Sequence, residues 1–144
     1  MKGYFKPNNP HKYKGDASNI IYRSSWELKA MATFDKHPSI LRWNSEEVII
    51  PYRSSIDGKI HRYFPDFWVE KLGRDGKKSV VVIEVKPYKE TVEPKKQKKM
   101  TKSYLYEVKT WAVNTSKWKA AVEYCADRGW DFQLMTEREL GIKY

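Results

Sequence analysis

The sequence predicts a single α/β or α+β domain built on a small mixed β-sheet, and three observations lead to this fold class. The chain has 144 residues, 40% of them hydrophobic, which is enough to bury one core. Helix-like and strand-like segments follow one another in the order α-β-β-β-α-(α)-β-α. Residues 79–86 are apolar on both alternating faces, as in a strand that is covered on both sides.

Helices are expected in three places. Residues 24–36 form the first. Residues 102–128 form the second, with room for a break near residues 114–116, and Gly129 is placed to end it. The run Thr136-Glu137-Arg138-Glu139 fits a capping box that opens a short terminal helix.

Strands are expected in four segments rich in β-branched and aromatic residues, at 48–52, 63–70, 80–86 and 131–135. A polar turn at Asp75-Gly76 joins the second and third into a hairpin. Residues 1–19 combine lysines with glycine, proline and asparagine, which is typical of an extended basic arm. We therefore expect an arm over residues 1–19 and one domain over residues 20–144.

The chain is strongly basic, with a formal net charge of +10. This surplus favours a polyanionic partner, most often nucleic acid, although a lysine-rich soluble protein or one bound to anionic membranes is the alternative. Each candidate contact to a phosphate backbone can also be read as part of a solvated surface. These candidates are Lys12, Lys14, Lys95, Lys96, Lys98, Lys99 and Lys102.

Cys125 is the single cysteine, so an internal disulfide is impossible and a reducing compartment is expected. Its neighbours predict a buried, unreactive thiol. No apolar run is long enough to cross a membrane and no secretory signal is evident, so we expect an intracellular protein without a membrane partner.

The aromatic and histidine residues favour structural roles. Trp111 and Trp118, together with Val122 and Cys125, are expected to pack a helix onto the sheet rather than stack on bases. The three histidines have no zinc-ligand spacing. His61 lies near the hairpin but is expected to be structural.

Glu84 is a carboxylate inside the apolar strand at residues 79–86, where an unpaired charge is costly. Lys86 lies on the same face, because side chains two apart on a strand point the same way. A simple Glu84–Lys86 pair near a sheet edge is one interpretation.

Asp66 favours a different interpretation. It stands among aromatic residues, and the midpoint between positions 66 and 84 falls at the Asp75-Gly76 turn. A hairpin would therefore bring Asp66 and Glu84 opposite each other, where like charges destabilise the pair. A divalent cation would remove the conflict, and Mg²⁺ commonly takes one or two carboxylates. Asp66 alone could also be a turn residue after Pro65.

Glu27 has two interpretations that do not exclude each other. The run Ser24-Ser25-Trp26-Glu27 fits a capping box, in which Glu27 serves the helix start. Glu27 also begins the i, i+3, i+4, i+7 stripe that faces the core, which allows a role at the metal site.

Pro65-Asp66 followed by Glu84-Val85-Lys86, with Glu27 upstream, resembles the PD-(D/E)XK nuclease signature. Nearly the whole chain resembles the TnsA-like endonucleases and, within them, the head completion nucleases of T-even-type tailed phages. Three stretches carry this likeness, at residues 22–28, 61–67 and 83–87.

The resemblance implies a restriction-endonuclease-like core and a metal-dependent DNA nuclease. Asp66 and Glu84 would bind Mg²⁺, or Mn²⁺ in its place, with the Val85 carbonyl as a further ligand. Lys86 would lie beside the scissile phosphate, and Glu27 would complete the metal shell or orient the attacking water.

The resemblance also implies a physiological setting. The enzyme would act on packaged double-stranded DNA in the host cytoplasm during phage head completion and head–tail joining, with retention in the virion and contacts to head or neck proteins as further implications. Alternatives are a non-catalytic head protein that binds DNA ends, and a transposase or junction-resolving subunit.

Overall fold

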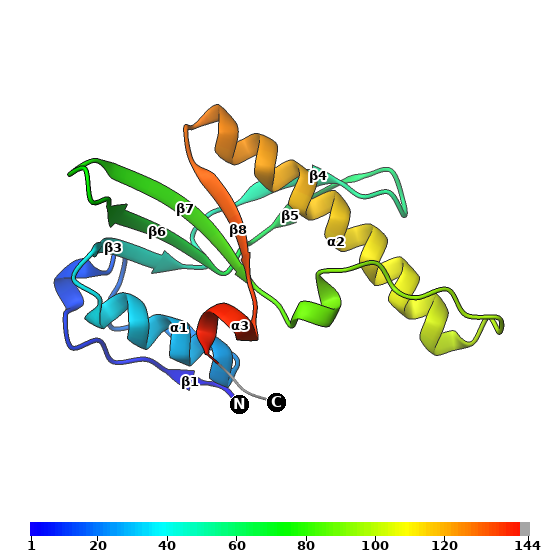
Figure 1. Ribbon diagram of the computed structural model, residues 1–144, viewed down its shortest axis with the longest axis horizontal. Coiled ribbons are helices and arrows are strands. Elements are labelled where there is room, and N and C mark those ends of the chain that lie inside the picture. The colour runs from blue at the N-terminus through cyan, green and yellow to red at the C-terminus, as the bar shows by residue number, and fades with distance from the viewer. Residues whose placement is uncertain (142–144) are drawn as a thin grey trace.

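A four-stranded mixed sheet forms the centre of the computed structural model, which describes residues 1–141 (Figure 1). The strands lie in the order β3-β6-β7-β8. Strand β6 is antiparallel to both β3 and β7, and β8 is parallel to β7. Their bounds are Ile40–Ser45 (β3), Phe67–Leu72 (β6), Lys78–Val85 (β7) and Asp131–Met135 (β8).

Helices cover both faces of this sheet (Figure 1). Helix α1 (Ser25–Lys36) and the short α3 (Glu137–Leu140) pack on one face, and α2 (Lys102–Asp127) on the other. Successive strand residues alternate between the faces. Val81 accordingly belongs to the cluster that holds α1, and Val82 to the cluster that holds Cys125 of α2.

A second, two-stranded sheet is formed by β4 (Ile50–Arg53) and β5 (Ile60–Tyr63), which pair as an antiparallel hairpin. We call it the β4–β5 hairpin. It packs on the middle of α2 through Trp118 and Ala121. The sequence predicts one strand over residues 63–70, whereas the structure divides this segment between two sheets. Pro65 lies at the division, since it has no N–H to donate to a ladder.

Two further expectations need correction. Strand β3 was not predicted, because its buried polar residues Asn44 and Ser45 hide the alternation that marks a strand. The expected break near residues 114–116 is absent and α2 is continuous there. Thr115 and Ser116 direct their hydroxyls to the carbonyls of Trp111 and Ala112, at 2.9 Å each, so they stay compatible with the helix.

The aromatic residues of α2 largely pack as expected. The Trp111 and Trp118 rings make an edge-to-face contact with centroids 5.9 Å apart, and both belong to the cluster with the β4–β5 hairpin. Cys125 is fully buried, and burial raises the pKa of its thiol to about 11, as an unreactive thiol requires. Val122 differs from the expectation, because 55% of it is exposed.

The amino-terminal segment is extended and packs against the domain instead of standing apart. Strand β1 (Gly3–Tyr4) pairs with β2 (Ile21–Tyr22), and the short helix η1 (Pro10–Lys12) follows β1. Tyr13 is buried in edge-to-face contact with Trp43, their centroids 4.8 Å apart.

Lys12 was expected to contact DNA, but the structure buries it. Its Nζ donates hydrogen bonds to the carbonyl oxygens of Phe34, Asp35 and His37, at 2.7, 3.0 and 2.9 Å. The charge therefore lies at the carboxyl end of α1, where a cation stabilises the helix dipole and satisfies carbonyls that have no helical partner. We leave Lys12 out of the proposed DNA contacts.

Replacing Lys12 with Met is expected to destabilise the protein by about 2 kcal/mol, because carbonyl oxygens at the end of α1 lose their donor. Chemical denaturation would measure the change. Lys6→Met removes the same charge from an exposed position of the same segment and should change stability little. Equal stability of the two variants would contradict the capping role.

No helix within the described part of the chain, residues 1–141, is long and apolar enough to span a membrane.

Candidate active site

Asp66 and Glu84 face each other across the β6–β7 hairpin. The last ladder pair is Phe67 with Ile83, so the next step of the same register places position 66 opposite position 84. The Val85 N–H donates a hydrogen bond to Asp66 Oδ2 at 2.8 Å, which ties the two strand ends together. The turn closes around Gly76, whose φ of 78° suits glycine. The hairpin and its register are as the sequence predicts.

The two carboxyl groups are buried and interact strongly. Burial raises the pKa of Asp66 to about 8, and the charge of Glu84 adds to the rise. Burial also raises the pKa of Glu84, and the charge of Lys86 opposes this rise. Near neutral pH the pair therefore keeps one proton, and it resists carrying two negative charges without a cation.

The pair points toward the α2 side of the sheet. Positions 66 and 84 have the same strand parity as Trp68 and Val82, which pack against Cys125 of α2. Tyr63 lies beside the pair, and burial together with the charge of Glu84 raises the pKa of its hydroxyl. A lysine of α2, Lys117, is close enough to favour the ionised form of Glu84.

Glu27 lies in the first turn of α1, directly after the helix start that Ser24 caps. The Ser24 hydroxyl accepts a hydrogen bond from the Glu27 N–H and donates one to Glu27 Oε2, each at 3.1 Å. The side chain is nevertheless buried, and its pKa is raised first by burial and then by the charge of Asp66. Ser24 is thus the N-cap of α1, and the Glu27 carboxyl group lies close enough to Asp66 for that charge to affect its pKa.

Lys86 follows directly after β7. Its backbone N–H donates to the Met135 carbonyl at 3.0 Å, which fixes the chain where it leaves the sheet. Its positive charge lowers the pKa values of both Asp66 and Glu84, so its ammonium group lies near the pair. The structure therefore brings Glu27, Asp66, Glu84 and Lys86 to one end of the hairpin.

A divalent ion fits the chemistry of this pair. Within residues 1–141, no group of three or more His, Cys, Asp and Glu side chains is arranged as a metal site. Two carboxylates are nevertheless the donor set that Mg²⁺ uses when it keeps several of its waters. Burial raises the pKa values of Asp66 and Glu84, so a cation bound between them would favour their ionised forms. Asp66 and Glu84 are the residues that would hold the ion.

The remaining basic candidates lie outside this centre. Lys14 is exposed, and its Nζ lies 4.5 Å from the centroid of the Trp68 ring. Figure 1 shows the segment before α2, together with the first turns of that helix, extending beyond the sheet. The exposed lysines of this segment are Lys95, Lys96, Lys98, Lys99 and Lys102.

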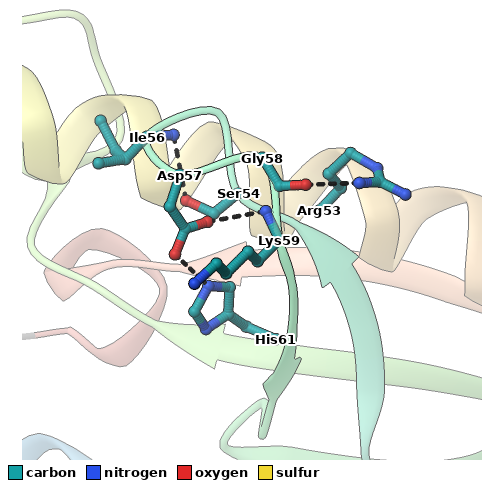
Figure 2. A network of polar contacts seen from close by, with 7 residues as sticks. All are labelled: Arg53, Ser54, Ile56, Asp57, Gly58, Lys59 and His61. Carbon is teal, nitrogen blue, oxygen red and sulfur yellow. Dashed lines mark hydrogen bonds and ion pairs between the residues drawn. The ribbon is translucent and has the colours of Figure 1, made fainter.

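The tip of the β4–β5 hairpin is held by its own polar contacts (Figure 2). His61 Nε2 is 2.7 Å from Asp57 Oδ2, and the Lys59 N–H donates to Asp57 Oδ1 at 2.9 Å. His61 thus stabilises the hairpin tip, and its ion pair is with Asp57 rather than with Asp66 or Glu84. Tyr63 and Lys117, which do approach the pair, were not predicted, since nothing in their local sequence marks them.

Comparison with known proteins gives two matches. The family model described as the TnsA-like endonuclease N terminal matches residues 37–137. The chain is 42% identical over 148 aligned residues to the head completion nuclease of Enterobacteria phage T4, and the alignment covers 98% of this chain and 96% of that protein. No solved structure matches the chain.

Proposed function

Since the chain belongs to the family of TnsA-like endonucleases, we propose that its nuclease activity is the Mg²⁺-dependent hydrolysis of DNA phosphodiester bonds at Asp66, Glu84 and Lys86. Membership confirms the restriction-endonuclease-like α/β fold and the assignment as a nuclease. The observation that supports the chemistry best is the buried pair of Asp66 and Glu84, whose ionised forms a bound cation would stabilise.

Each residue has a distinct part in the proposal. Asp66 and Glu84 would hold the metal ion, and the Val85 carbonyl and Glu27 would be further ligands. When bound there, the ion would polarise a phosphoryl oxygen as a Lewis acid and lower the pKa of a bound water. Lys86 places positive charge where the phosphate gains negative charge during attack. Glu27 alternatively orients the attacking water. Mn²⁺ is the expected substitute for Mg²⁺.

Binding of the duplex is assigned to Lys14 and to the exposed lysines before α2. Lysines that contact phosphates release counterions, so affinity should fall steeply with salt. We propose that the substrate is packaged phage DNA during head completion and head–tail joining, in the host cytoplasm. The name of the T4 relative supports this setting, and retention in the virion beside head or neck proteins is part of the same proposal.

The proposed function is tested by incubating the protein with linear and closed circular DNA. We expect cleavage with Mg²⁺ or Mn²⁺ and none with excess EDTA, because Asp66 and Glu84 cannot act without the ion. Nicking or linearisation of the circle would identify endonuclease activity. Full cleavage in EDTA, or none with either metal, would contradict the proposal.

A further inference from the structure

Lys117 lies on α2 above two tyrosine rings of the β4–β5 hairpin. Its Nζ is 5.9 Å from the ring centroid of Tyr52 and 5.6 Å from that of Tyr63. Both tyrosines are buried, at 7% and 3% exposed, so their positions are fixed by the packing of the hairpin on α2. The aromatic faces attract the ammonium group and hold it in one place.

The ammonium group of Lys117 is available to bind an anion. Within residues 1–141, its Nζ takes part in none of the hydrogen bonds and in none of the ion pairs, which join Arg23 to Glu46, Arg42 to Glu70 and His61 to Asp57. A cation–π contact leaves the three N–H donors of an ammonium group available. The side chain is only partly buried, so an anion can reach it.

Lys117 lies near the pair of carboxyl groups formed by Asp66 and Glu84. Tyr63, which lies under its Nζ, also lies beside Glu84 and comes three residues before Asp66. The charge of Lys117 favours the ionised form of Glu84, which agrees with a location on this side of the rings. Lys86 reaches the same pair from the sheet, whereas Lys117 reaches it from α2.

We propose that Lys117, held by Tyr52 and Tyr63, is a second phosphate-binding site that takes the backbone phosphate next to the one being cleaved. This inference rests on the proposed nuclease function. Two lysines from different layers would contact consecutive phosphates, which fixes the direction in which the strand crosses Asp66 and Glu84. A lysine is suited to this task, because its ammonium group is a compact charge with three donors.

The test measures DNA binding separately from cleavage. All variants carry Asp66→Asn, and the affinity for a fluorescent duplex is followed by anisotropy at several salt concentrations. Lys117→Met keeps the apolar contact with the rings but removes the charge. It is expected to weaken binding and to lower the slope of log affinity against log salt by about 0.9, the value for one phosphate contact. Lys117→Arg should keep most of the affinity and the original slope.

Lys119→Met is the matched control, because Lys119 is exposed two positions further along α2, where the side chain points away from Lys117. It should leave both quantities unchanged. Equal affinity and slope in Lys117→Met and the parent would overturn the inference, and so would equal losses in Lys117→Met and Lys117→Arg, which would indicate packing. Absence of Mg²⁺-dependent cleavage by the unsubstituted protein would instead contradict the proposed function.

Discussion

Replacing Asp66 with Asn is expected to lower the rate of Mg²⁺-dependent DNA cleavage by roughly 10³-fold or more, because the metal ion loses a charged ligand. The fold should remain intact. An asparagine side-chain oxygen can still accept the hydrogen bond from the Val85 N–H. Its amide can donate a hydrogen bond to a neighbouring carboxylate without adding a second negative charge beside Glu84.

Glu84→Gln is expected to give a loss of the same order, measured as single-turnover cleavage of a linear duplex. DNA binding should be largely kept in both variants. Asp127→Asn and Glu123→Gln make the same chemical changes at exposed positions of α2 and should retain full activity. Full activity of Asp66→Asn or Glu84→Gln would remove these residues from the reaction.

The second large effect is on stability without metal. In EDTA, the free energy of unfolding is expected to fall as pH rises from about 5 to about 8, by on the order of 1 kcal/mol per pH unit. Burial and the charge of Glu84 raise the pKa of Asp66 to about 8 in the folded protein. In the unfolded chain, the pKa of an Asp carboxyl group is about 3.9.

The sign follows from the protons that each state holds. Between these two pKa values the folded chain keeps a proton that the unfolded chain has lost, so raising the pH favours unfolding. The raised pKa values of Glu84 and Glu27 act in the same direction. Urea denaturation at several pH values measures the slope. The stability of Asp66→Asn should depend less on pH. A wild-type slope of zero or of opposite sign would contradict the raised pKa values of Asp66 and Glu84.

Much of the fold follows from the sequence. The α1 and α2 regions, the β6–β7 turn and strand β8 have periodic patterns or capping residues that act locally, and the structure agrees with them. Strand β3 and the division at Pro65 could not be predicted in this way. They depend on which sheet a segment joins, and that choice is made by tertiary packing rather than by local propensity.

The candidate site could likewise be predicted only in part from the sequence. Asp66 and Glu84 could be placed together, because one turn and a two-residue period determine their register. Lys117 comes from a helix far along the chain, so no spacing connects it with the pair, and Tyr63 is close to Asp66 in sequence but belongs to the separate β4–β5 hairpin. Lys12 shows the opposite case, since a lysine in a basic segment is normally solvated but here satisfies three carbonyls.

The unfolding temperature at pH 8, measured with EDTA and with Mg²⁺, tests most directly whether one ion binds both Asp66 and Glu84. Ligands that bind only the folded state raise this temperature. We predict that Mg²⁺ stabilises the wild-type protein, in which Asp66 and Glu84 both provide charge, and has little effect on Asp66→Asn. An equal response of the two proteins, or no response of the wild type, would contradict a shared ion between these strands.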